Sequence, residues 1–160
     1  MNTTILKQIC LLSIFLGAAL GVITIIPFIG EIAFWILMCL TAPVVLCFMI
    51  YNGSLAIQEV KESIILGSIV GFVSFIGFSI FYIPIITILA KVFNIYPNYG
   101  VSVAISNASF GILFILVLFM GVLSATVNAF SGFLTFYGID LYKMFNKKNE
   151  KFEVKEDDRI

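Results

Sequence analysis

The sequence predicts an all-α integral membrane protein, a bundle of four transmembrane helices, and its composition is the first reason. Of the 160 residues, 61% are hydrophobic and only 11% are charged, whereas soluble domains have about 45–50% apolar and about 25% charged residues. Nine basic and nine acidic residues cannot cover a water-facing surface, since a folded chain of this size still exposes roughly 30% of its unfolded surface. Composition therefore excludes a soluble domain, a disordered chain and a nucleic-acid-binding protein.

The spacing of the charges is the second reason. Charged residues separate four uncharged stretches, each long enough for the roughly 20 residues that a helix needs to cross a hydrocarbon core. The alternating pattern of a membrane β-barrel is absent, which leaves helices. Within a domain of residues 1–145 we predict spans at about 9–27, 32–51, 64–83 and 108–137.

The aromatic residues are the third reason. Tyrosine and tryptophan prefer the headgroup layer, where the ring is buried and its polar tip is wet. All seven fall at or just outside a predicted helix end: Trp35, Tyr51, Tyr82, Tyr96, Tyr99, Tyr137 and Tyr142.

Lysine and arginine predict the orientation. Lys7, Lys61 and the six basic residues from Lys143 onward fall on one side of the predicted bundle, and only Lys91 falls on the other. The positive-inside rule then places both termini in the cytoplasm. We expect a bacterial plasma (inner) membrane, with residues 146–160 as a polar, disordered tail because few of them are apolar.

The connection at 84–107 has two interpretations. It is either a short amphipathic helix on the outer surface, closed by the turn at Tyr96–Gly100, or an extension of the third span past Pro84 to about Ala90 under an outer cap. We favour the extension.

Residues 13–28 align with 63–78 as an internal repeat. The shared positions are small, they fall on one helix face, and each copy contains Gly-x-x-x-Gly, which lets helix backbones approach closely in lipid. This predicts two parallel-repeated helical hairpins and a set of helix-packing residues: Ser13, Gly17, Gly21, Ser63, Gly67, Gly71 and Ser74.

The fourth span carries a second small-residue stripe with a 3-4-3-4 spacing, in which Gly121 precedes a candidate polar seam. The seam consists of Ser124, Asn128, Ser131 and Thr135. An amide as deep as Asn128 must find a partner. It either forms an interhelical hydrogen bond or lines a solute path. Pro43 lies midway along the second span, and we expect it to kink that helix.

The missing chemistry narrows the function. The chain has no histidine, which excludes histidine-based acid–base catalysis and most zinc sites. No charged residue lies deep in a span, which argues against a proton relay. The three cysteines form no C-x-x-C pair. We therefore expect no catalytic, cofactor or metal site and no enzyme.

Leu16–Gly30 is a Gly-x-x-x-Gly helix that ends in Ile-Pro-Phe-Ile-Gly, and a second span and a charged turn lead from it into another Gly-x-x-x-Gly helix at Ser63–Gly77. In this pattern the chain resembles small four-span membrane proteins of bacteria and archaea that have no assigned activity, and the resemblance implies fold and location only.

We expect a non-enzymatic packing or accessory subunit, embedded in the lipid bilayer as a homo-oligomer or beside another membrane protein. The alternative is a small permeation protein, either a holin-like pore or a transporter of an uncharged or lipid-like solute.

Overall fold

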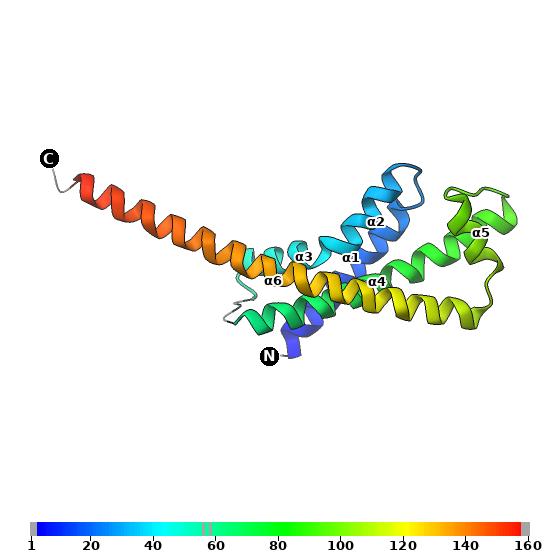
Figure 1. Cartoon of the computed structure of the whole chain (residues 1–160), viewed down its shortest axis with the longest axis horizontal. Helices are drawn as coiled ribbons and strands as arrows, with labels where there is room; N and C mark the ends of the chain where they lie inside the picture. Colours follow the sequence, from blue (N-terminus) through cyan, green and yellow to red (C-terminus); the bar gives the residue numbers. More distant parts are fainter. Residues whose placement is uncertain (1–2, 56, 58, 158–160) are drawn as a thin grey trace.

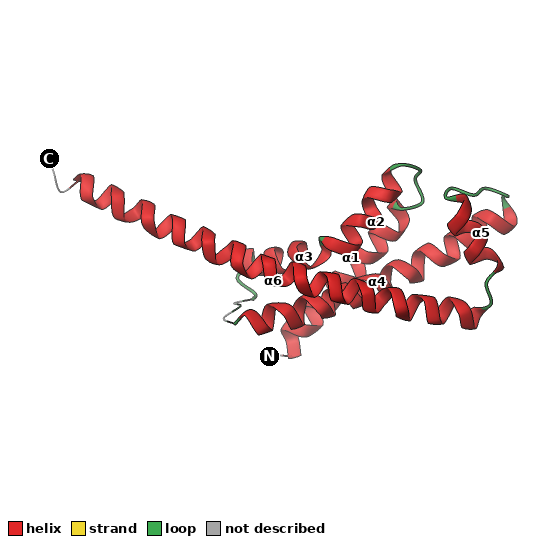
Figure 2. Ribbon diagram, in the orientation of Figure 1, coloured by secondary structure: helices red, strands yellow, loops and turns green. Residues whose placement is uncertain are grey.

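The structure is a computed structural model that describes residues 3–55, 57 and 59–157, with side chains up to Phe145. The described residues form helices and no strand (Figure 2). The helices are α1 (Thr3–Ile23), α2 (Ile29–Cys39), α3 (Thr41–Tyr51), α4 (Val60–Val92), α5 (Tyr99–Asn107) and α6 (Phe110–Asp157).

Three of these helices are each long and apolar enough to cross a membrane: α1, α4 and α6. The pair α2 and α3 adds a fourth crossing if the two helices form one bent span. Figure 1 shows α1 and α4 running in the same direction and α6 returning against them. These are the helices of a multi-pass membrane protein. The two ends of the bundle are called below the α5 end and the terminal end, after α5 and the chain termini.

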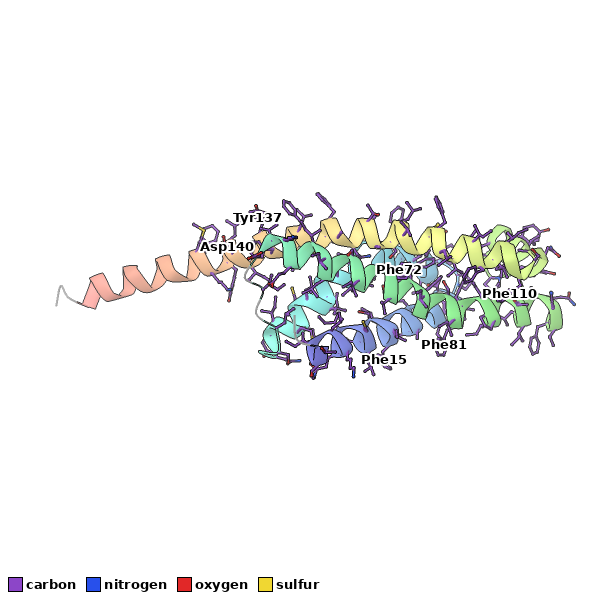
Figure 3. The ribbon with its side chains drawn as sticks, turned by 90° about the horizontal axis from the view of Figure 1, so that it is seen from below. Phe15, Phe72, Phe81, Phe110, Tyr137 and Asp140 are labelled. Carbon is purple, nitrogen blue, oxygen red and sulfur yellow. The ribbon has the colours of Figure 1, made fainter. Side chains whose placement is uncertain are left out.

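The outer surface is apolar. Large hydrophobic side chains point away from the bundle, among them Phe15 and Phe81 (Figure 3), whose exposed fractions are 72% and 46%. In water such a surface would drive aggregation, whereas in a bilayer it faces lipid.

The second predicted span is broken. The axes of α2 and α3 meet at 64° around Leu40. Pro43, three residues later, has no N–H to bond the carbonyl of Cys39, and its ring crowds that carbonyl. Neither Thr41 nor Ala42 donates a backbone bond back to Leu37 or Met38. The break therefore leaves backbone groups in the middle of the bundle without partners inside their own helix.

Two apolar clusters lie on either side of this break. Toward the terminal end, Ile9, Leu46 and Leu66 belong to one buried cluster. Toward the α5 end, Leu37 and Phe78 belong to the other. Between them the helices carry fully buried polar side chains: Ser13, Thr41, Ser74, Ser124 and Asn128.

The C-terminal segment differs from the expectation. We expected a disordered tail at 146–160, but α6 continues as helix to Asp157 and projects past the rest of the bundle (Figure 1). No glycine or proline follows Gly138, and the lysines and glutamates of this segment are good helix formers. A polar composition alone did not end the helix. Residues 158–160 lie outside the described part.

The connection at 84–107 combines features of both interpretations. α4 continues through Pro84 to Val92, and a separate nine-residue helix, α5, follows the turn. At 1.5 Å per residue α4 is about 50 Å long, which is more than a hydrocarbon core of about 30 Å needs. Its last part and α5 therefore form a cap beyond the predicted third span.

The two halves of the predicted repeat pack differently. Gly17 and Gly21 of α1 face α4, whereas Gly67 and Gly71 of α4 face α6. In the first predicted hairpin, the helix that follows α1 is the broken pair α2–α3. In the second, the helix that returns after α4 is the unbroken α6. The parallel-repeated hairpins therefore remain a prediction.

Candidate functional site

The side-chain amide of Asn128 lies at the break between α2 and α3. Its Nδ2 donates to the carbonyl of Met38 at 2.9 Å and lies 3.3 Å from that of Leu37. Its Oδ1 accepts from the N–H of Ala42 at 2.9 Å. One amide on α6 therefore bonds the Ala42 N–H and the Met38 carbonyl, which the bend deprives of their mutual helical bond, and this explains how a polar side chain is stable at this depth.

Hydroxyl groups complete this cluster. The Thr41 Oγ1 lies 2.9 Å from Asn128 Oδ1 and 3.0 Å from the Leu37 carbonyl, and its single proton serves one of them. Ser124 Oγ donates to the carbonyl of Gly71 at 3.0 Å. Asn128 Nδ2 also donates to the Ser124 carbonyl at 3.0 Å. α2, α3, α4 and α6 are thus joined by hydrogen bonds at one level of the bundle.

The predicted helix-packing residues are all buried. A Cβ at Gly17 would overlap the carbonyl of Ser74, and a Cβ at Gly67 would lie 2.5 Å from the backbone oxygen of Asn128. Ser63 Oγ donates across the same interface to the carbonyl of Gly132 at 2.6 Å, and Ser13 Oγ donates to Ile9 within α1. The small residues let α1, α4 and α6 of one chain approach closely.

The polar seam of α6 has a different register from the predicted one. Ser124 and Asn128 are fully buried, whereas Ser131 and Thr135 are half-buried, and the Thr135 hydroxyl bonds within its own helix to the Ser131 carbonyl. Gly132 takes the next buried position, where a Cβ would lie 2.6 Å from the Ser63 carbonyl. The contact follows i+4 steps over 124, 128 and 132. This spacing is the signal that would have identified Gly132.

A cavity of about 880 Å³ opens at the α5 end. One side of the cavity is formed by α2 and the turn between α1 and α2. The other side is formed by α4, α5 and the start of α6, and the two sides stand apart in Figure 1. Along α4 its lining runs from Phe75 to Ile83, a depth of about 12 Å. Most of the lining is aliphatic or aromatic, and Ser124 and Asn128 do not belong to it.

Aromatic rings form the inner wall of this cavity. Phe78 stacks on Tyr82 with ring centroids 4.8 Å apart and meets Phe34 edge-on at 6.2 Å. Trp35 also lines the cavity and is 68% exposed. Because these residues come from α2 and α4, the bend at Leu40 sets the direction of one wall.

The turn between α1 and α2 forms the rim. Phe28 has φ 67° and ψ −51°, and the N–H of Ile29 bonds to the carbonyl of Pro27 at 2.9 Å. This is a γ-turn of the positive-φ kind, a rare and strained conformation. Gly30 fits closely against the Thr24 carbonyl, where a Cβ would overlap it. That fit fixes the first turn of α2, which carries Glu31 at the cavity rim.

Sequence reasoning did not find this cavity, because its lining is scattered over residues 24–35, 75–83 and 97–120. Its apolar residues look the same in the sequence as lipid-facing ones. The one signal was Glu31, an isolated charge between two apolar stretches. Comparison of the chain with models of protein families, with curated proteins and with solved structures found no match.

Proposed function

We propose that this chain is a non-enzymatic, multi-pass membrane protein that holds a lipid-like molecule in the cavity at its α5 end. The cavity is the observation that carries the proposal. A volume of about 880 Å³ falls within the range of about 300–1,000 Å³ found for ligand pockets, which are also lined mostly by apolar and aromatic side chains.

The lipid-like solute would lie in this cavity at the α5 end and not along the polar seam of α6. Asn128 and Ser124 are fully buried and hydrogen-bonded to backbone groups, which favours a structural role for them. The cavity is apolar and lies beside them, toward the α5 end. A holin-like pore through the seam is therefore not part of the proposal.

The glycine faces favour a role within the chain. Gly17, Gly67 and Gly71 meet backbone atoms of neighbouring helices of the same chain, so they are not free to join a second copy. We propose that the protein sits in a bacterial plasma membrane with both termini in the cytoplasm, because eight of the nine basic residues then lie inside. The cavity then opens in the outer half of the bilayer.

Photo-crosslinking tests the proposal. The purified protein would be placed in phosphatidylcholine nanodiscs with a diazirine-bearing diacylglycerol, and labelled residues would be mapped by mass spectrometry. We expect saturable labelling of the inner wall at Phe78 and Tyr82, which an unlabelled diacylglycerol reduces. Labelling only at lipid-facing positions such as Ile115, which is 68% exposed, would refute it.

A matched pair of variants controls this experiment. Ala104 lines the cavity, so Ala104→Phe places a ring in the space and should reduce labelling of the inner wall. Thr126 is exposed on α6 and lines no described cavity, so Thr126→Phe should leave labelling unchanged. Equal effects of the two variants would show that the label does not report on the cavity.

A further inference from the structure

We propose that the cavity selects an amphiphilic organic cation, an ammonium or phosphonium centre on an apolar body, through the carboxylate of Glu31. The inference rests on the proposed function, since it assumes that the cavity holds a membrane-soluble ligand. It adds the charge and the chemical class of that ligand. The inference is based on one carboxylate, that of Glu31, in a cavity that is lined by aromatic side chains and by no basic side chain among the described residues.

The charge that the described lining of the cavity carries is negative. Glu31 is the only charged residue that lines the cavity, and no lysine or arginine does so in the part of the chain that the structure describes. Lys91, the basic residue of the α5 end, lines a separate and more polar cavity of about 410 Å³. Among the described residues no basic side chain pairs with Glu31. A ligand in the cavity therefore meets one uncompensated negative charge.

The surroundings strengthen this charge. Glu31 is exposed, but a ligand inside the cavity is surrounded by apolar walls that exclude water and lower the local dielectric constant, so the carboxylate attracts a cation there more strongly than it would in bulk water. Phe34, Trp35, Phe78 and Tyr82 also line the cavity and add a second attraction, because aromatic rings attract organic cations, and quaternary ammonium groups are recognised in this way. The remaining aliphatic lining suits an apolar body.

The same features disfavour a phospholipid or another anion. Phosphate is held by lysine, arginine or clustered N–H donors, and the cavity lining supplies no basic side chain. A phosphate at the rim would instead meet the carboxylate of Glu31. The proposal therefore commits to a cation without a phosphate group, dissolved in the membrane.

Three near-isosteric probes of different charge test the inference: tetraphenylphosphonium, neutral tetraphenylsilane and tetraphenylborate. Each would compete with the diazirine-bearing diacylglycerol for the inner wall in nanodiscs. We expect Glu31→Gln to weaken competition by tetraphenylphosphonium at least tenfold and to leave tetraphenylsilane within twofold. Competition by tetraphenylborate should stay equal or improve. Comparing each probe between the two proteins cancels its own partitioning into lipid.

The control is Glu59→Gln, an exposed carboxylate beside α4 at the terminal end, which should change none of the three. Equal shifts for all three probes in Glu31→Gln, or no shift for the cation, would overturn the inference. If none of the probes competes while the inner wall is still labelled saturably, the inference fails and the proposed function stands. If the wall is not labelled in the unmodified protein, both fail.

Discussion

Asn128→Leu should destabilise the protein far more than an ordinary hydrogen bond in a membrane would suggest. The variant keeps the number of side-chain heavy atoms and their branching at Cγ, and it removes the amide. Two backbone groups then lose their partners, the carbonyl of Met38 and the N–H of Ala42. The Thr41 hydroxyl lies 3.0 Å from the Leu37 carbonyl and can donate its proton to that carbonyl once the Asn128 oxygen is gone.

The magnitude follows from these two groups. An unsatisfied buried polar group costs about 1–3 kcal/mol, so the loss should be about 2–6 kcal/mol. An average interhelical hydrogen bond in a membrane protein contributes about 0.6 kcal/mol. The difference arises because Asn128 bonds to a broken backbone, which has no alternative partner in lipid.

The assay is unfolding in mixed micelles by added SDS, followed by circular dichroism and by the fluorescence of Trp35. Thr126→Leu, an exposed position on the same helix, is the matched control and should change stability by less than about 0.5 kcal/mol. A loss below about 1 kcal/mol for Asn128→Leu would refute the reasoning, because the backbone groups at the break would then have other hydrogen-bond partners.

A second-site change sharpens the test. Pro43→Ala restores an N–H and removes the ring that crowds the Cys39 carbonyl, so α2 and α3 can join and bond Leu37 and Met38 within one helix. Pro43→Ala should therefore rescue Asn128→Leu by about 1 kcal/mol or more, and the two changes should be non-additive. Simple addition of the two effects would show that the bend and the amide are independent.

The remaining predictions concern packing, the turn and topology. Gly17→Ala should cost more than about 2 kcal/mol, because its Cβ would overlap the Ser74 carbonyl, whereas Gly138→Ala in open space should gain about 0.5–1 kcal/mol; equal effects in SDS unfolding would contradict the close packing. Ser102→Ala should stabilise by about 1 kcal/mol, since Ser102 Oγ is the buried side-chain polar atom without a partner in the described part, while Ser63→Ala, which loses a 2.6 Å bond to Gly132, should destabilise by a similar amount. Phe28→Gly should relieve the γ-turn and raise stability by up to about 1 kcal/mol, and a clear loss in the same assay would argue against strain. In a background without native cysteines, a cysteine at Asn98 should react with an impermeant maleimide from outside the cell and one at Lys148 only after permeabilisation; labelling of both from one side would refute the orientation.

The sequence was sufficient for the helical class of the fold. The spacing of the charges alone separates the apolar stretches. In lipid every backbone N–H and C=O must find a partner within the protein, so these stretches are expected to be helices. Gly17 and Gly67 were predicted as packing residues, and both are buried against neighbouring helices of the chain. What the spacing could not give was the partner of each face, because a glycine stripe suits a helix of the same chain and of another chain equally.

The break in the second span shows a different limit. Pro43 indicated that hydrogen bonds would be lost there, but proline in lipid causes anything from a slight bend to a full interruption, depending on what replaces the lost bonds. That replacement is Asn128, which lies on α6, 86 residues from Ala42 in the chain. Neither residue explains the other until their helices are packed.

The break and the cavity belong to one arrangement. With the 64° bend at Leu40, α2 leaves the direction of α3, and Figure 1 shows α2 standing apart from α5 and the start of α6. Side chains from both sides of this space line the cavity, among them Phe34 on α2 and Ile105 on α5. Asn128 makes the bend tolerable by bonding both half-helices. Because Ala42 lies level with Asn128, an unbent span along α6 would bring Phe34 toward Met120 and reduce the space that a ligand needs. Of the two roles that the sequence left open for Asn128, the interhelical hydrogen bond is the one that its contacts support, and through it Asn128 stabilises the bend on which the cavity depends.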